Sequence, residues 1–322
     1  MFANSRGRQP NHPTITVWLA IFRQTITLEV IATGTANSDN GIMSTTTLTQ
    51  KHDNGFGRLL RSWRERRKRS QLELSLEADV SQRHVSFLES GRAKPSREMI
   101  LQLAEVLDIP LRDRNLLLNS AGFTAVYPAR PLHSEEMSAV RQALDLTLQH
   151  HNPYPAMVVD RAWNLLLQNT AAMRFINLLG DAEAKWQAVD PSGLRNVMRL
   201  TFSADGMQPL ISNWPEVAGL LLSRLQREVA ADPDHQQLSE LYDELCQLPS
   251  IPERWRSDSI LTAPEPVLPL ELQWNGATLR IFSMISTFGT ALDITADELR
   301  VETFFPADDF SAQFFQSLAV AS

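Results

Sequence analysis

The sequence predicts an α+β protein, with a small all-α domain near the N-terminus followed by one antiparallel sheet that has helices against one of its faces. Two patterns support this prediction. Between Phe56 and Gly122, apolar residues recur at spacings of three and four, as on one face of a helix. In the last quarter, β-prone segments flank Asn275-Gly276, a dipeptide typical of tight hairpins.

Length and composition limit the number of domains and the classes of protein that the chain can belong to. A chain of 322 residues favours two or three domains. The single cysteine, Cys246, excludes an internal disulfide framework and a cysteine-rich zinc site, and it fits a reducing cytoplasm. The most apolar stretch, 15–31, contains Arg23 and Glu29, so it is a poor membrane span and a poor signal peptide. We expect no membrane association, no cofactor and no metal.

Charge is unevenly distributed along the chain. Residues 55–100 carry 11 Lys/Arg against 6 Asp/Glu, whereas residues 101–322 carry 15 against 28, and the net charge of the whole chain is −7. A compact basic module joined to a large acidic one indicates a nucleic-acid partner for the basic part alone.

Residues 1–54 show no lasting periodicity and are rich in Thr, Asn, Ser and Gly, which predicts a disordered extension. Either Met1 or Met43 can be the true start. The first helix is expected at 56–68, with Phe56, Leu59, Leu60 and Trp63 as its buried stripe and arginines, among them Arg61 and Arg64, on the rest of its surface. Part of this arginine cluster suits phosphate neutralisation, and a solvated helix face is the alternative.

Residues 70–92 predict two short helices joined by a tight turn. Ser70 and Ser81 are placed as N-caps, and the residues expected to pack the helices together are Leu72, Ala78, Val80, Val85 and Leu88. The second helix turns Gln82, Arg83, His84 and Ser86 outward, which are side chains that reach base edges and phosphates in a major groove. A helical hairpin used only for dimerisation is the alternative.

Later elements follow from the same signals. Gly91 ends the second short helix, Pro95-Ser96 opens a fourth helix, and Pro110 starts a fifth that stops near Gly122. Arg92, Lys94 and the Ser96 hydroxyl at a helix N-terminus are phosphate candidates. Beyond the linker we expect helices at 134–150, 169–179, 189–202, 214–231 and 236–248, and strands at 156–160, 163–168, 267–274, 278–288 and 299–306.

The helical region resembles the XRE-type helix-turn-helix family, which has the lambda-repressor-like fold. The matching residues are Ser70-Gln71, the turn at 78–81 (ADVS), Val85-Ser86 and the tail at 89–96 (ESGRAKPS). The resemblance implies operator contacts by Gln71, Gln82 and Arg83, with Gln71 bracing the second helix or touching phosphate. The predicted DNA-binding set is Gln71, Ser81, Gln82, Arg83, His84, Ser86, Arg92, Lys94, Ser96, Arg61 and Arg64.

Longer phrases resemble bacterial regulators with an MmyB-like C-terminal ligand-binding domain. They lie at 81–92 (SQRHVSFLESGR), 112–117 (RDRNLL), 121–127 (AGFTAVY), 153–163 (PYPAMVVDRAW), 248–255 (LPSIPERW) and 302–306 (ETFFP). The resemblance implies a PAS-like sensor domain and a fatty acid or similar apolar ligand. The expected organisation is an extension at 1–54, the DNA-binding domain at 55–123, a linker at 124–133, the ligand-binding domain at 134–310 and a tail at 311–322.

Aromatic and methionine side chains of the second domain suit the wall of an apolar cavity, although most such residues are ordinary core. The residues predicted to contact a ligand are Met157, Trp163, Phe175, Phe202, Trp214, Phe282 and Met284. We find no nucleophile elbow, zinc-binding His-Glu-x-x-His or phosphate loop, so we do not expect an enzyme.

The sequence therefore predicts a cytoplasmic, nucleoid-associated bacterial regulator that binds a double-stranded DNA operator as a homodimer. A repressor that senses an apolar small molecule is the first hypothesis. A constitutive DNA-binding factor, whose second domain is a ligand-free dimerisation or interaction module, is the second.

Overall fold

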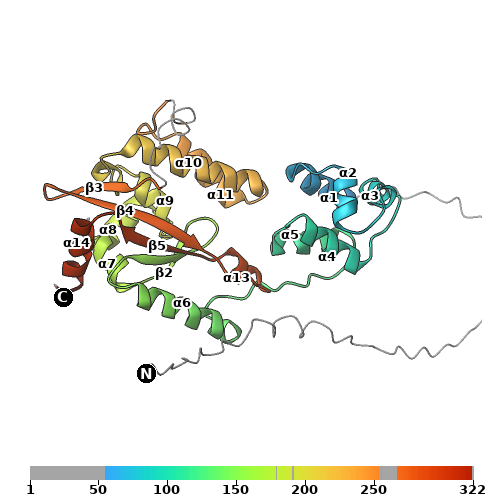
Figure 1. Ribbon diagram of the computed structural model, residues 1–322, viewed down its shortest axis with the longest axis horizontal. Coiled ribbons are helices and arrows are strands. Elements are labelled where there is room, and N and C mark those ends of the chain that lie inside the picture. The colour runs from blue at the N-terminus through green and yellow to red at the C-terminus, as the bar shows by residue number, and fades with distance from the viewer. Residues whose placement is uncertain (1–54, 179, 191, 254, 256–266, 321–322) are drawn as a thin grey trace, which may run out of the picture. The chain divides into compact units, whose positions relative to one another are not determined.

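The computed structural model describes residues 55–178, 180–190, 192–253, 255 and 267–320, and its elements are labelled in Figure 1. The predicted N-terminal extension, with the choice between Met1 and Met43, lies outside the described residues. The α+β class is confirmed: a helical N-terminal region precedes a domain built on an antiparallel sheet. Within the described parts of the chain, no helix has both the length and the hydropathy needed to cross a membrane.

Five helices form the N-terminal domain, as predicted. They are α1 (Gly55–Arg66), α2 (Gln71–Glu77), α3 (Gln82–Glu89), α4 (Arg97–Val106) and α5 (Leu111–Ser120). Serine hydroxyls cap three of them. Ser70 accepts a hydrogen bond from the backbone N–H of Glu73, whose carboxylate accepts from the Ser70 N–H in return, and this capping box fixes where α2 begins.

The packing of α2 corrects one prediction. Leu72 is 50% exposed, whereas Leu74 is fully buried among Leu60, Val85 and Leu88. The helix is only seven residues long, so its apolar stripe spans less than two turns and its phase cannot be read from spacing alone. The other residues predicted to pack the two helices, Ala78, Val80, Val85 and Leu88, do contact this core.

Asp113 on α5 is a buried acid in this domain. It is 4% exposed, and its Oδ2 has no hydrogen-bond partner among the described residues. Burial raises the pKa of the Asp113 carboxyl to about 6, because a low-dielectric environment disfavours the charged form. At pH 7 the folded protein therefore holds a poorly solvated carboxylate.

We expect Asp113→Asn to stabilise the protein at pH 7, by no more than about 3 kcal/mol, since each pKa unit corresponds to about 1.4 kcal/mol. A raised acid pKa makes the wild type lose stability as the pH rises from about 4 to about 6. The gain from Asp113→Asn should therefore shrink at pH 4. Urea unfolding of both proteins at pH 4 and pH 7 measures the gain in stability. An equal gain at the two pH values would contradict the assignment of burial of the Asp113 carboxylate as its cause.

The C-terminal domain contains all the strands of the described chain. Its helical elements are η1 (Glu135–Met137), α6 (Ser138–His151), α7 (Thr170–Asn177), α8 (Ala182–Val189), α9 (Val197–Phe202), η2 (Gln208–Leu210), α10 (Trp214–Ala231), α11 (Gln236–Cys246), α13 (Ile294–Glu298) and α14 (Asp309–Val320). Its strands are β1 (Ala156–Val159), β2 (Leu165–Gln168), β3 (Leu270–Trp274), β4 (Ala277–Ser286) and β5 (Arg300–Pro306).

The strands form one five-stranded sheet in the order β2-β1-β5-β4-β3, and every neighbouring pair is antiparallel. The predicted hairpin joins β3 to β4 at Asn275-Gly276, both of which have positive φ (47° and 79°). Two successive positive φ values are the requirement of the type I′ turn, which explains the Asn-Gly pair. The last strand, β5, is the central strand of the sheet and joins β1, from the start of the domain, to β4.

Helices cover both faces of the sheet, not one face as predicted. On one face α6 packs against β1 and β5 through Leu144, Leu148 and Val158. On the other, α10, α11 and α9 bury Leu222, Leu241 and Phe202 against the sheet, and Figure 1 shows α6 and α10 on opposite sides of the strands. On β1, Met157 and Val159 face the core on the α10 side, and Ala156 and Val158 face the core on the α6 side. This alternation follows from the two-residue period of a strand.

Two further differences concern helix limits. The predicted tail at 311–322 is helical from 309 to 320, and Phe315 of α14 is buried in the main core beside Tyr154 and Phe175. The predicted helix at 189–202 is helical only over α9, and the unpredicted α8 precedes it. Asn196 begins α9 because its side chain accepts from the N–H of Arg199, which is a local capping signal.

Candidate DNA-binding surface and ligand cavity

The helix α3 presents a polar edge over an apolar base. Ser81 caps it by accepting from the His84 N–H at 3.1 Å. Val85 and Leu88 are fully buried beneath it, and Gln82 and Arg83 are exposed in its first turn. His84 and Ser86 are half-buried. The first turn is therefore the part of α3 that is free to approach a partner.

Two arginines flank one aromatic ring beside that edge. The guanidinium carbons of Arg83 and Arg92 lie 5.1 and 4.8 Å from the ring centroid of Phe87. Arg92 also donates from Nε to the Ser90 hydroxyl at 2.9 Å. Cation–π contacts of this kind limit the freedom of a long side chain before any partner binds. Lys94 and Ser96 are exposed nearby in sequence, and Ser96 caps α4.

A buried ion pair connects α1 to α3. Arg64 donates from Nε and Nη2 to the two oxygens of Glu89 at 2.6 and 3.0 Å, and its Nη1 donates to the Arg69 carbonyl at 2.8 Å. The hydrogen bond to Glu89 outweighs burial and raises the pKa of Arg64. Gln71 of α2 donates to the same carboxylate at 2.8 Å. Glu89 thus joins the three helices that present the edge.

Of the residues predicted to contact DNA, Gln71 and Arg64 both bind Glu89 inside the domain. Gln71 braces α3 through Glu89, as one of its two predicted roles requires. Arg64 lies 8% exposed inside the domain, where it cannot reach a phosphate without leaving Glu89. Its partner lies 25 positions away in sequence, so spacing gave no signal of the pairing. Arg61 is exposed, and it pairs with Glu65 at 2.8 Å.

The C-terminal domain holds an apolar cavity of about 150 Å³ between the sheet and the helices α9 and α10. An apolar cavity of roughly this size is enough for a benzene-sized group. Its lining consists of Trp163, Val197, Met198, Thr201, Val217, Leu220, Leu221, Leu268, Leu270, Ile281, Phe282, Ser283, Glu302 and Phe304.

A second cavity of about 60 Å³ shares part of this wall and is lined by apolar side chains from β1, α7, α8 and α9. The residues common to both cavities are Val197, Thr201, Leu270, Ile281 and Phe304. A shift of these shared side chains would join the two spaces, which together extend from α10 to α8 on the same face of the sheet.

The structure separates the predicted ligand contacts into groups. Trp163 and Phe282 line the first cavity, and Met157 and Phe175 line the second. Phe202 and Trp214 instead pack edge to face in the core, with ring centroids 5.0 Å apart, and line neither cavity. Met284 is 55% exposed. Residue type identified apolar positions but could not distinguish cavity wall from core.

Trp163 has an unusual backbone and charged neighbours. Its φ is +68°, a left-handed value that is rare for a bulky residue. The guanidinium carbons of Arg224 and Arg300 lie 4.4 and 5.4 Å from its ring centroid, and its Nε1 donates to Glu228 at 3.1 Å. Glu228 also pairs with Arg300 at 2.8 Å and Arg224 at 3.0 Å. One residue therefore joins the apolar cavity to an ion-pair network on α10 and β5.

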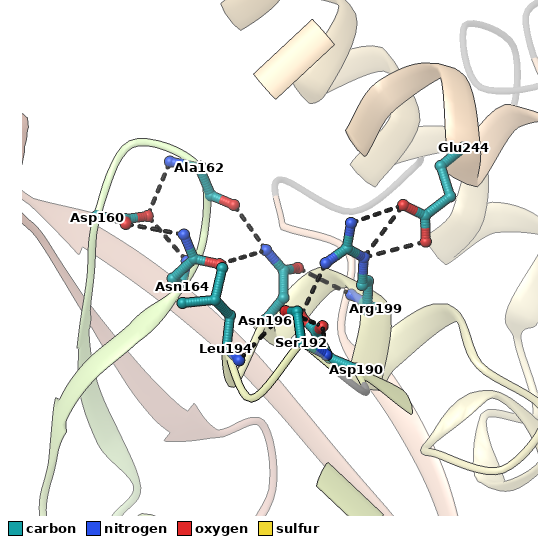
Figure 2. Close-up of polar contacts among 9 residues, drawn as sticks. All are labelled: Asp160, Ala162, Asn164, Asp190, Ser192, Leu194, Asn196, Arg199 and Glu244. Carbon is teal, nitrogen blue, oxygen red and sulfur yellow. Dashed lines mark hydrogen bonds and ion pairs between the residues drawn. The ribbon is translucent and has the colours of Figure 1, made fainter. Parts of the chain in front are cut away.

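A polar network holds α9 in place at the edge of this cavity (Figure 2). Asn196 donates from its amide to the Ala162 carbonyl at 2.8 Å and to Asn164 at 3.0 Å. Asn164 in turn bonds Asp160, which closes the turn between β1 and β2. The network fixes the N-terminus of α9 against the turn that contains Trp163.

The C-terminal side of the same network involves Arg199. Its Nη1 donates to Asp190 at 2.7 Å, and its Nε and Nη2 donate to Glu244 of α11 at 3.0 and 2.8 Å. Burial alone would raise the pKa of Asp190, but hydrogen bonds from Ser192 and Arg199 lower it. Figure 2 shows both carboxylates facing the guanidinium from opposite sides. The cavity wall at α9 is thus tied to both the sheet and α11.

Three polar residues of the cavity were not predicted: Thr201, Ser283 and Glu302. Glu302 on β5 is 7% exposed, and its Oε1 accepts from the Ser283 hydroxyl at 2.7 Å. Burial raises the pKa of the Glu302 carboxyl. The available sequence signal for Glu302 was a single acid inside the strand RVETFFP. A polar residue in a strand is the usual sign of a solvent-facing position, so this signal did not indicate burial.

Helices α2 and α3, joined by a tight turn and held to α1 through Glu89, have the arrangement of a helix-turn-helix domain. A helix-turn-helix family model matches residues 60–113. The model of the MmyB-like transcription regulator ligand binding domain matches residues 140–318, so the chain belongs to that family. The protein is accordingly a DNA-binding transcription regulator with a ligand-binding domain. No curated protein is significantly similar to the chain in sequence.

Proposed function

We propose that this protein is a repressor that binds its operator as a homodimer and releases or tightens it in response to a small apolar, fatty-acid-like molecule. The observation that carries the proposal is the apolar cavity of about 150 Å³ in the ligand-binding domain of a chain that also presents an exposed α3. Such a cavity has the composition of a small-molecule site: apolar walls with a few polar groups.

The DNA-binding half of the proposal rests on α3. Gln82 has the amide that pairs bidentately with adenine, and Arg83 has the guanidinium that pairs with guanine or phosphate. A single short helix reads few base pairs, so two copies on half-sites about one helical turn apart would supply the specificity of a regulator. Repression needs only that the bound dimer exclude another protein from the same DNA.

The sensing half requires that the ligand favour one state of the protein, because equal affinity for two states shifts neither. The cavity wall at α9 is tied to α11 through Arg199 and to the sheet through Asn196. A ligand that displaces α9 would therefore strain both connections, which supports a coupled change over a local one.

The test uses the full chain. Operators are selected from random DNA duplexes, and native mass spectrometry establishes the stoichiometry and any copurified small molecule. Operator affinity is then compared before and after removal of lipid by hydrophobic chromatography. We expect two chains per duplex and a change in affinity on delipidation. A protein without bound small molecule, with the same affinity throughout, would favour a constitutive factor with a ligand-free module.

Reporter expression from the selected operator tests the sign of regulation. Deletion of the regulator should raise expression if it represses. A fall in expression on deletion would identify an activator and overturn that part of the proposal alone.

A further inference from the structure

Among the residues that the structure describes, Glu302 supplies the one carboxyl group that lines the apolar cavity between β5 and α10. Ser283 on the neighbouring strand β4 donates to Oε1 at 2.7 Å, while Oε2 accepts no hydrogen bond from the described residues. The side chain is on the cavity side of the sheet together with Phe304, two residues along β5, because alternate residues of a strand share a face. A carboxyl group is therefore present in a mostly apolar space, in which Ser283 and Thr201 supply the hydroxyl groups.

Such a group imposes a requirement on any occupant. An oxygen that loses its access to water without gaining a hydrogen bond is costly, so an occupant that only fills space and covers Oε2 adds that cost. An occupant with a hydroxyl group can donate to a carboxylate or accept from a carboxylic acid, and so satisfies Oε2 in either protonation state of Glu302.

A carboxylate ligand meets a different situation. Two carboxyl groups at one site cannot both ionise without repulsion, so one of them must hold a proton that is scarce at neutral pH. Two charged residues of α10, Arg224 and Glu228, act on the pKa of the Glu302 carboxyl in opposite directions. With Arg300 they form the network beside Trp163, in which both guanidinium groups already pair with Glu228, at 3.0 and 2.8 Å.

We propose that Glu302 selects the polar end of the ligand, and that this end is an uncharged hydroxyl group on an aliphatic chain, not a free carboxylate. The inference rests on the proposed apolar ligand of this cavity and narrows its chemical class from fatty-acid-like to fatty-alcohol-like. Ser283 is a positioning residue here, because its hydrogen bond to Oε1 fixes the orientation of the Glu302 carboxyl group.

The test compares octan-1-ol with octanoate at pH 7.5, by isothermal titration calorimetry on the delipidated full chain. The two probes have the same number of carbons and differ in charge. We expect the wild type to prefer octan-1-ol by about tenfold or more, and Glu302→Gln to reduce that preference by about the same factor. The amide removes the negative charge and can donate to the carboxylate of octanoate.

Glu216→Gln is the matched control, since Glu216 is an exposed carboxylate at the start of α10 that lines neither cavity. It should keep the wild-type preference. Ser283→Ala removes the hydrogen bond that orients the carboxyl group and should reduce the preference for octan-1-ol, by a smaller factor than Glu302→Gln does, so it tests the role of Glu302 even if Glu302→Gln fails to fold. Thermal unfolding of each variant establishes that it is folded.

Two results would overturn the inference, and they can be told apart. If both probes bind and the preference is absent or unchanged by Glu302→Gln, the role of Glu302 is wrong while the apolar ligand site stands. If neither probe binds wild type, Glu302→Gln or Ser283→Ala, the proposed ligand function fails and this inference fails with it.

Discussion

Alanine at Gln82 or Arg83 is expected to weaken operator binding by the full chain by about 5- to 150-fold each, since a bidentate base contact contributes about 1–3 kcal/mol. Both side chains are exposed in the first turn of α3, and Arg83 also lies against Phe87. Non-specific DNA affinity should change little for Gln82→Ala, because an amide neutralises no phosphate.

Asn119→Ala is the control, because Asn119 is an exposed amide of α5, away from α3. Fluorescence anisotropy with the selected operator and a scrambled duplex separates specific from non-specific binding. Full specific affinity in both Gln82→Ala and Arg83→Ala would contradict the assignment of α3 as the reading helix.

Arg64→Met is expected to destabilise the DNA-binding domain by about 3–5 kcal/mol, because it leaves the buried Glu89 carboxylate without its charge partner. The side chains of Arg64 and Glu89 are only 10% and 5% exposed, and the pair is doubly hydrogen bonded. Hydrogen exchange in peptides of α1 and α3 measures the local loss of protection without interference from the second domain.

Arg61→Met removes an exposed ion pair with Glu65 on the same helix and should cost less than about 1 kcal/mol. The double variant Arg64→Met/Glu89→Met should recover much of the loss, since apolar replacement of both partners removes the uncompensated charge. If Arg64→Met costs no more than Arg61→Met, the ion pair does not hold α3 as described.

The sequence predicted the helices of the first domain because their start signals are local. Ser70, Ser81 and Ser96 each stand at an N-cap in the structure. It placed Leu72 wrongly because α2 is too short for a reliable phase. It also missed α8 and the helical end of the chain, where Phe315 gains its place from contacts with Tyr154 and Phe175 far away in sequence.

The candidate sites show the same division between local and distant information. Gln82 and Arg83 lie on the exposed edge that their helical positions predicted. Arg64 was predicted to face solvent because its partner Glu89 belongs to another helix. Trp163 lines the cavity while Phe202 and Trp214 pack against each other, which depends on neighbours far away in sequence, and Glu302 lines the same cavity as residues of α10.

The burial of Arg64 has a consequence for how operator affinity depends on salt. Binding releases counterions from DNA only where a protein cation approaches a phosphate, at a slope of about −0.9 per phosphate. Arg64 is held by Glu89 inside the fold, so it releases none. Although residues 55–100 carry 11 Lys/Arg, the salt dependence should therefore be shallower than that number suggests. A salt titration would count the phosphates reached by exposed cations such as Arg92 and Lys94.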